Sequence, residues 1–358
     1  MLIQTDTQMN FSDFAVSKRK IDMTFFDSIN KIVDWNKLEV IVKKHYNKGM
    51  SADGRPAYEG ILLFKIILLQ TWFKLSDEGV EERINDSIKF TKFLGLSLED
   101  SVPDHSVISR FRKEMSQKNA MKKVLGELNR QLVKHKIIIH TGVLVDASVT
   151  ISPYTPSQPT TFEIASDRNE EERTSEETKK EGTYHKKLNK LENNGTDKEA
   201  RWLKKGKQSY YGYKKHVATN DDGMILGLET TTANESDTKH FIPLLKKLKI
   251  KEGTRVKTDK GYSSKSNKEY LKENNLKSGI QYKAVRGKEL TQREKQFNKM
   301  VSKTRYAVER TFGGIKKWFN GGVAKYKGIE KMDYQHHLEA MAYNLYRSPG
   351  LVRANESK

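Results

Sequence analysis

The sequence lacks cysteine throughout its 358 residues, so neither disulfide bonds nor cysteine-bound zinc sites can form. This absence fits a protein of the reducing cytosol. Long apolar runs are also missing: the most apolar stretch, 61–73, is too short to span a bilayer and is interrupted by Lys65. We interpret it as a buried helix. The first residues lack the basic start and apolar run of a secretory signal peptide. We therefore expect a cytoplasmic protein with no membrane partner.

Acidic residues are outnumbered, with 46 Asp and Glu against 66 Lys and Arg, which leaves a formal net charge of +20. This balance favours a polyanionic partner, because neutralising phosphates and releasing their counterions supplies most non-specific affinity for nucleic acid. Charge alone also fits a ribosome-associated or merely basic protein.

The first 135 residues have helical periodicity throughout. An amphipathic pattern begins at Phe25, a strongly apolar helix is predicted over 58–75, and another over 81–94 closes near Gly95. After Pro103, either Asp104 or Ser106 is a suitable N-cap for a further helix. We predict an all-helical unit, 1–135, for DNA binding or dimerisation.

The helix after Pro103 carries Arg110 and Arg112 close to its start, and we take both as candidate DNA contacts. A helix-turn-helix that inserts this helix into a DNA groove is one interpretation. A helical packing domain is supported about equally well.

From residue 137 onward, β-branched runs alternate with helical patterns. The order is a strand, a hairpin around the turn 220–223, and then helix, strand, helix, strand and helix. This alternation predicts an α/β fold with a mixed sheet flanked by helices over 136–350. An insertion at about 154–206, first acidic and then basic, is expected to be exposed and partly disordered. Its basic half could contact DNA, and a solvated linker is the favoured interpretation. Residues 351–358 are expected to form a tail that is frayed over 354–358.

Three carboxylates stand out in this second unit. Asp146 and Asp259 each end a short β-like apolar run, and Glu309 lies in a predicted helix. In that helix Arg305, Glu309 and Lys316 fall within about 40° of one another. A solvated helix face would give the same pattern, and for the helix alone it is the favoured interpretation. Carboxylates from two strands and a helix, however, can hold two divalent metals, and hard cations such as Mg²⁺ prefer carboxylate oxygen.

These motifs resemble those of DDE-class insertion-sequence transposases. Within that class they are most similar to the branch numbered five, which is grouped with branch four in one superfamily. The resemblance spans roughly residues 50–347. Its segments are Gly54-Arg55-Pro56, 102–112, 144–148 around Asp146, 212–216, 232–237, 258–262 around Asp259, and the Arg305, Glu309 and Lys316 set. The tyrosine of the family signature would fall at Ser302, and Tyr306 is out of register.

The resemblance implies a ribonuclease H-like core in which Asp146, Asp259 and Glu309 are catalytic and bind Mg²⁺, with Mn²⁺ able to substitute. It also implies that Arg305 and Lys316 bind DNA phosphates. Lys260, beside Asp259, is a further candidate DNA contact, although a solvated lysine is an equally simple interpretation.

Such an enzyme would bind the inverted ends of its element and target DNA, cleave and transfer strands, and act as a homodimer or larger complex. It would work in the cytoplasm of a bacterial or archaeal cell, at the nucleoid. The alternatives are a catalytically inactive DNA-binding descendant and a nuclease on the same core.

Overall fold

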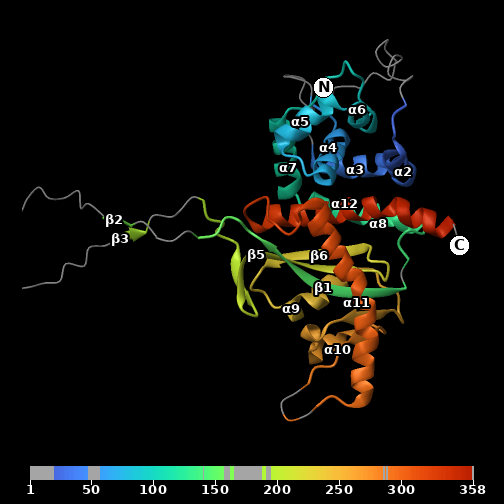
Figure 1. The fold of residues 1–358 in the computed structure, drawn as a ribbon, viewed down its shortest axis with the longest axis vertical. Coiled ribbons are helices and arrows are strands. Elements are labelled where there is room, and N and C mark those ends of the chain that lie inside the picture. The colour runs from blue at the N-terminus through green and yellow to red at the C-terminus, as the bar shows by residue number, and fades with distance from the viewer. Residues whose placement is uncertain are drawn as a thin grey trace, which may run out of the picture.

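The computed structural model describes residues 20–46, 57–139, 141–156, 162–164, 188–190, 195–284, 287 and 289–356. Its N-terminal part is a helical unit, as predicted (Figure 1). The helices are α2 (Thr24–Ile32), α3 (Trp35–His45), α4 (Gly60–Phe73), α5 (Asp77–Asp86), α6 (Ile88–Leu94), α7 (His105–Gln117) and α8 (Ala120–Lys134). No helix of the described residues is long and apolar enough to cross a membrane.

The predicted caps are confirmed at two helix ends. Asp104 accepts a hydrogen bond from the backbone N–H of Val107 at the start of α7 over 2.9 Å. Gly95 ends α6 with φ +79°, a conformation that glycine adopts without steric cost. The single helical pattern predicted from Phe25 is instead two helices, because the chain is extended at Val33 and Asp34.

The second part contains a mixed sheet in the order β6-β5-β1-β7-β8. β1 pairs antiparallel with β5 and parallel with β7, and β8 continues the parallel side. These strands are β1 (Gly142–Ile151), β5 (Gln208–Thr219), β6 (Ile225–Thr232), β7 (Arg255–Thr258) and β8 (Lys277–Ile280). Together with its flanking helices, the sheet confirms the predicted ribonuclease H-like α/β class.

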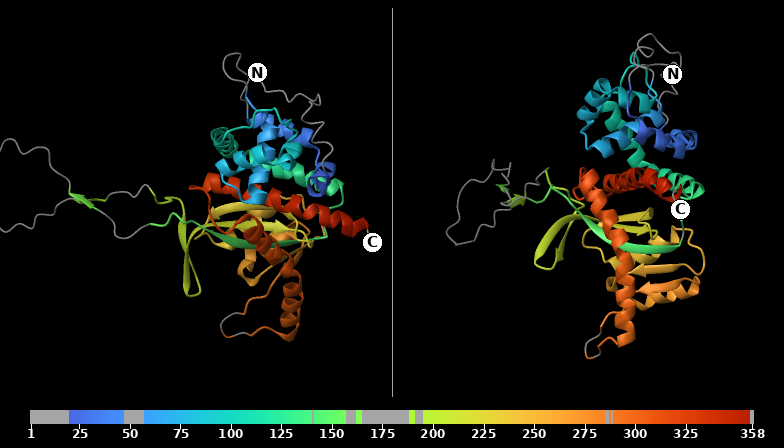
Figure 2. Two further views of the ribbon diagram at one scale, coloured as in Figure 1. Left: turned by 45° about the horizontal axis from the view of Figure 1, so that its top comes forward. Right: turned by 45° about the vertical axis from the view of Figure 1, so that its right-hand side comes forward.

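Helices cover both faces of this sheet (Figures 1 and 2). The buried side chains of α9 (Asp237–Lys246) and α10 (Lys265–Glu273) pack on one face, with Val143 and Val145 of β1. α11 (Gln292–Phe319) and α12 (Ile329–Glu356) cover the other face, on which Leu144 lies. Alternate residues of β1 therefore face different helices, as the two-residue period of a strand requires.

α12 lies between the helical unit and the sheet (Figure 1). Trp72 of α4 donates its indole N–H to the carbonyl of Ala342, and Asn344 hydrogen-bonds both Asn129 of α8 and Ile225 of β6. One apolar cluster runs from the helical unit through α12 to the sheet. The two predicted units thus share a core.

Several boundaries differ from the predictions. α11 starts at Gln292, well before Arg305, because Thr291 and Glu294 form a capping box. The predicted tail does not begin at residue 351, since α12 continues to Glu356 and Leu351 and Val352 pack on the core.

The predicted insertion at 154–206 lies partly outside the described residues, including its acidic runs, as does the Gly54-Arg55-Pro56 motif. Within it, β2 (Phe162–Ile164) pairs with β3 (Leu188–Lys190), and β4 (Arg201–Lys205) forms a hairpin with the start of β5.

Candidate active site

The register of two neighbouring strands brings Asp146 and Asp259 together. β1 and β7 run parallel, and the last pair of their register is Leu144 opposite Lys257. Continuing that register by two residues brings Asp146 beside Asp259, which lies just past the end of β7. Adjacent strands are about 4.8 Å apart. Asp259 directly follows the end of β7, as predicted. Asp146 does not end its strand: β1 continues to Ile151 because it still pairs with β5 there.

α11 adds a cation to this pair of carboxylates. Arg305 donates from Nη2 to Oδ2 of Asp146 over 2.8 Å, and both side chains are largely buried. The other oxygen of Asp146 accepts the N–H of Ala147, and Oδ1 of Asp259 accepts the N–H of Gly261. Glu309 lies one helical turn after Arg305 and is exposed.

Burial and like charge raise the pKa of Asp146. Loss of water is the largest cause, the Asp259 charge adds to it, and Arg305 opposes both. Burial works against the charge of Arg305, but Asp146, Asp259 and Glu309 together raise the pKa of that guanidinium. All three carboxylates therefore act on one arginine, although only Asp146 contacts it.

The donor set suits a hard divalent cation. Among the described residues, no three histidine, aspartate or glutamate side chains are close enough to hold a metal together. Asp146 and Asp259 nevertheless offer adjacent carboxylate oxygens, the ligands that Mg²⁺ and Mn²⁺ prefer. The buried hydroxyl of Tyr262 has no hydrogen-bond partner among the described residues. Burial, and then the charges of these aspartates, raise the pKa of Tyr262 well above its usual value. A bound cation would relieve the repulsion between the two aspartates.

Three of the candidate DNA contacts are exposed: Lys316 on α11, Lys260 after Asp259, and Arg110 on α7. The pKa of Lys316 is lowered, first by burial of part of its side chain and then by the charges of Lys215 and Lys205. Lys316 thus lies in a concentration of positive charge.

Arg112 was predicted to contact DNA, but in the structure its side chain is largely buried. Its side chain is 11% exposed, it forms an ion pair with Asp77, and its guanidinium stacks over the ring of Tyr326 at 5.1 Å. Its charge is thus already paired with a carboxylate, and its plane is packed on an aromatic ring. We correct the prediction and assign Arg112 to the packing of α7 against α5 and the segment before α12.

Two features of the site were missed by the sequence argument. Ser302, at the position of the signature tyrosine, accepts a hydrogen bond from Gln281 at the end of β8 over 2.7 Å and so fixes α11 against the sheet. Lys215 is buried and pairs with Glu339 of α12 over 2.7 Å. No local pattern signals either contact, because the partners are far apart in sequence.

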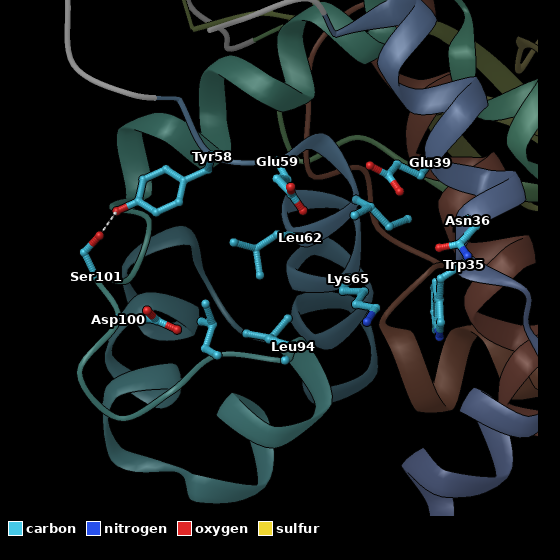
Figure 3. A pocket seen from close by; sticks show the side chains of 13 residues that line it. Trp35, Asn36, Glu39, Tyr58, Glu59, Leu62, Lys65, Leu94, Asp100 and Ser101 are labelled. Carbon is cyan, nitrogen blue, oxygen red and sulfur yellow. Dashed lines mark hydrogen bonds between the residues drawn. The ribbon is translucent and has the colours of Figure 1, made fainter. Parts of the chain in front are cut away.

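A pocket in the helical unit is separate from this site (Figure 3). None of the residues that line it comes from β1, β7 or α11. Tyr58 donates to Ser101 on one side of the pocket, and Lys65 lies over the ring of Trp35 on another. Burial lowers the pKa of Lys65. The pocket contains no carboxylate pair on adjacent strands, and we assign it no part in strand chemistry.

Two aspartates at the centre of a ribonuclease H-like sheet are typical of enzymes that cleave or join nucleic-acid strands with divalent metals. Comparison with known proteins narrows this class. The family model described as "Transposase DDE domain" matches residues 160–345, and "Transposase domain (DUF772)" matches residues 15–114. The transposase for insertion sequence element IS1106 of Neisseria meningitidis serogroup B is 35% identical over 250 residues, which are 69% of this chain and 80% of that protein.

The chain belongs to the DDE transposases. It is accordingly an enzyme that binds DNA and cleaves and transfers DNA strands, in a family that uses divalent metal ions. These matches confirm the family that the sequence motifs indicated.

Two solved structures match the chain at low similarity. A piggyBac transposase synaptic complex with hairpin DNA is 10% identical with a TM-score of 0.38, covering 96% of this chain and 83% of that one. A Mos1 transposase paired-end complex with the left transposon end is 12% identical with a TM-score of 0.21, covering 85% and 81%. These scores are too low to add to the family assignment.

Proposed function

We propose that Asp146, Asp259 and Glu309 are the catalytic carboxylates, and that they hold two Mg²⁺ ions, for which Mn²⁺ can substitute. The observation that carries this proposal is the parallel register of β1 with β7, which brings Asp146 beside Asp259 just past the end of β7, near enough for the charge of Asp259 to raise the pKa of Asp146. Glu309 supports it from α11, since its charge acts on the same arginine as theirs. Mg²⁺ ions bound there would activate the attacking oxygen and stabilise the leaving oxygen.

The remaining residues of the site position DNA and balance charge. Arg305 is the counter-cation of Asp146 in this structure. When a cation takes that carboxylate, Arg305 is free to bind a DNA phosphate. Lys316 and Lys260, both exposed, bind phosphates on either side of the reacting bond and offset the negative charge gathered there. Arg110 contacts DNA from the helical unit.

The substrate we propose is the pair of inverted ends that bound the element, followed by target DNA. Joining two ends to one target requires two active sites, so we propose a homodimer or larger complex on DNA. The same substrate places the protein in the cytoplasm, at the nucleoid. Light scattering of the complex with end DNA will give its stoichiometry, and one protein per DNA end pair would contradict the dimer.

The test is cleavage of a plasmid that carries the DNA flanking this gene, with Mg²⁺ present. Wild type is compared with Asp146→Asn, Asp259→Asn and Glu309→Gln, which keep side-chain size and remove one charge each. We expect breaks at two inverted ends with wild type and none with the three variants. Glu273 is exposed on α10, and Glu273→Gln is the matched control, which should cleave like wild type.

Other outcomes separate the alternatives. Breaks at many sites without preference for ends would favour a nuclease on the same core. Specific binding with no breaks, in either Mg²⁺ or Mn²⁺, would favour an inactive DNA-binding descendant. Full activity of Asp259→Asn would remove that residue from the catalytic set.

A further inference from the structure

The hairpin of β4 and the first residues of β5 projects from the sheet as a separate two-stranded ribbon (Figures 1 and 2, yellow-green). It pairs Arg201 with Gly212 and Lys205 with Gln208. β1 pairs with β5 only as far as Gly212, and β6 only from Tyr213. On the turn side of Gly212, the described residues therefore include no further strand paired with the ribbon.

The base of the ribbon is firmly anchored. Tyr211 donates its hydroxyl proton to the carbonyl of Asp197, and Tyr213 donates to the Asp197 carboxylate. The backbone N–H of Gly328, before α12, donates to the hydroxyl of Tyr213. A Cβ at Gly212 would lie 2.1 Å from the carbonyl oxygen of Thr150, so only glycine allows the strand to pass there. The ribbon consequently leaves the sheet in a fixed direction.

The outer part of the ribbon is exposed on both faces. Trp202 is 54% exposed, and the ring of Tyr211 lies beside it with the two ring centroids 5.1 Å apart. A two-stranded ribbon in water is marginal without a third strand or a packing partner. A large aromatic side chain exposed on such a ribbon is a candidate contact for a partner that covers it.

The charge of the ribbon identifies the kind of ligand. From residue 201 to residue 220 the sequence contains no acidic residue. Lys204, Lys205 and Lys207 are exposed at and beside the turn. Lys205 is close enough to Lys316 for its charge to lower the pKa of that lysine. The ribbon thus extends the positive surface that begins beside the carboxylates, and an apolar protein partner would not neutralise it.

We propose that the β4–β5 ribbon lies in a groove of the DNA held at the active site. Lys204, Lys205 and Lys207 bind backbone phosphates, and Trp202 packs against the sugars and base edges of the groove wall. The major groove of B-DNA admits a two-stranded ribbon, which matches the dimensions of this element. The proposal rests on DNA binding and not on the assignment of the three carboxylates, so either can fail without the other.

The first experiment measures binding to a duplex of arbitrary sequence in EDTA, where no strand is cleaved, over a range of salt concentrations. Each phosphate contact contributes about 0.9 to the slope of log K against log salt. The triple variant Lys204→Gln, Lys205→Gln, Lys207→Gln should make the slope less steep by about 2.7. The matched control removes three exposed lysines on the α9 side of the sheet, Lys246, Lys249 and Lys251, and should leave the slope near that of wild type.

The second experiment compares Trp202→Ala with Trp202→Phe. Removing an aromatic side chain that stacks on a base weakens binding about 5- to 150-fold. For a groove contact by Trp202 we expect a loss at the lower end, about 5-fold, and phenylalanine should restore most of it. Circular dichroism melts establish that each variant is folded, as expected for changes on exposed side chains. Equal slopes for the hairpin triple and the α9 triple would overturn the phosphate contacts. Unchanged affinity in Trp202→Ala would overturn the groove contact.

Discussion

Arg305 of α11 donates a hydrogen bond to Asp146 of β1 over 2.8 Å, joining residues 159 positions apart. The arginine already neutralises the carboxylate that we assign to metal binding. Binding of a divalent cation must therefore exchange one positive partner of Asp146 for another. This exchange couples the metal site to the helix that carries Glu309 and Lys316.

Metal binding should be visible as a gain in stability, independent of activity. A ligand at ten times its dissociation constant stabilises the folded state by about 1.4 kcal/mol. Mg²⁺ should therefore raise the melting temperature of wild type, whereas Asp259→Asn should lose most of that rise. Differential scanning fluorimetry in EDTA and in Mg²⁺ measures it, with Glu273→Gln as the control that retains the shift. An equal shift in Asp259→Asn and wild type would contradict the assignment.

The buried ion pair between Lys215 and Glu339 should be costly to break on one side only. Both side chains are at most 3% exposed, and Lys215 also donates to the carbonyl of Gly321 after α11. Glu339→Ala leaves a buried ammonium without its counter-charge and should lower the free energy of unfolding by about 3–5 kcal/mol. Urea denaturation measures this. The double variant Lys215→Met, Glu339→Leu should recover most of the loss, and a double variant as unstable as the single one would contradict the explanation.

Gly212 should not tolerate a side chain. In Gly212→Ala the new methyl group would meet the Thr150 carbonyl oxygen at 2.1 Å, so β5 or β1 must shift. We expect a loss of about 3 kcal/mol in the free energy of unfolding. Gly313→Ala is the control, because that glycine lies within α11 with open space around it and alanine favours the helix by up to about 1 kcal/mol. Similar urea midpoints for both variants would argue against the close approach.

Arg110 and Arg112 should respond differently to substitution. Arg110→Gln removes an exposed cation and should reduce the salt slope of DNA binding by about 0.9 with little change in stability. Arg112→Gln leaves Asp77 half-buried without its ion pair and should lower the free energy of unfolding by about 2 kcal/mol. Titration of DNA and urea denaturation on both variants test this. The opposite pattern would restore the original prediction for Arg112.

Acid should destabilise the protein partly through His216. Its Nε2 hydrogen-bonds Thr231, its ring stacks on His240 at 4.7 Å, and Asp237 lies 3.9 Å away. Burial, and then the charge of His240, lower the pKa of His216 from 6.5 to about 4. The folded state keeps this histidine neutral while the unfolded chain takes up a proton near pH 6.5. Stability therefore falls as the pH drops from about 6.5 to about 4, by at most about 3 kcal/mol.

Urea denaturation of wild type and His216→Gln at pH 7 and pH 4.5 measures this contribution. Glutamine cannot take up the proton, so the variant should lose less stability between the two values. Burial also lowers the pKa of His336 well below its usual value. The loss of stability that His336 causes at low pH occurs in both proteins and therefore largely cancels when the two are compared. Parallel losses in wild type and variant would contradict the assignment.

Local signals in the sequence predicted the local features of the structure. The cap at Asp104, the left-handed glycine at Gly95 and the strand that ends before Asp259 all depend on a few neighbouring residues. The order of strands and helices followed from the change of apolar period, which is why the fold class was predictable.

Features that depend on distant partners were not predictable. Asp146 lies within β1 because β5 continues to pair with that strand, and Arg112 is buried because Asp77 and Tyr326 surround it. β4 was placed in the exposed insertion, since its lysine-rich residues lack the apolar alternation of a half-buried strand. Strand register and side-chain burial depend on residues that are distant in the sequence, so the residues around one position do not reveal them.

The position of α12 has a consequence for the gene. This last helix contacts the helical unit on one side and the sheet on the other, through Trp72 and Asn344 among others. A premature stop codon before Ile329 would remove α12, which contributes to the apolar core of both parts. Shortened translation products should consequently be degraded, instead of accumulating as separate DNA-binding fragments that compete with the full-length enzyme.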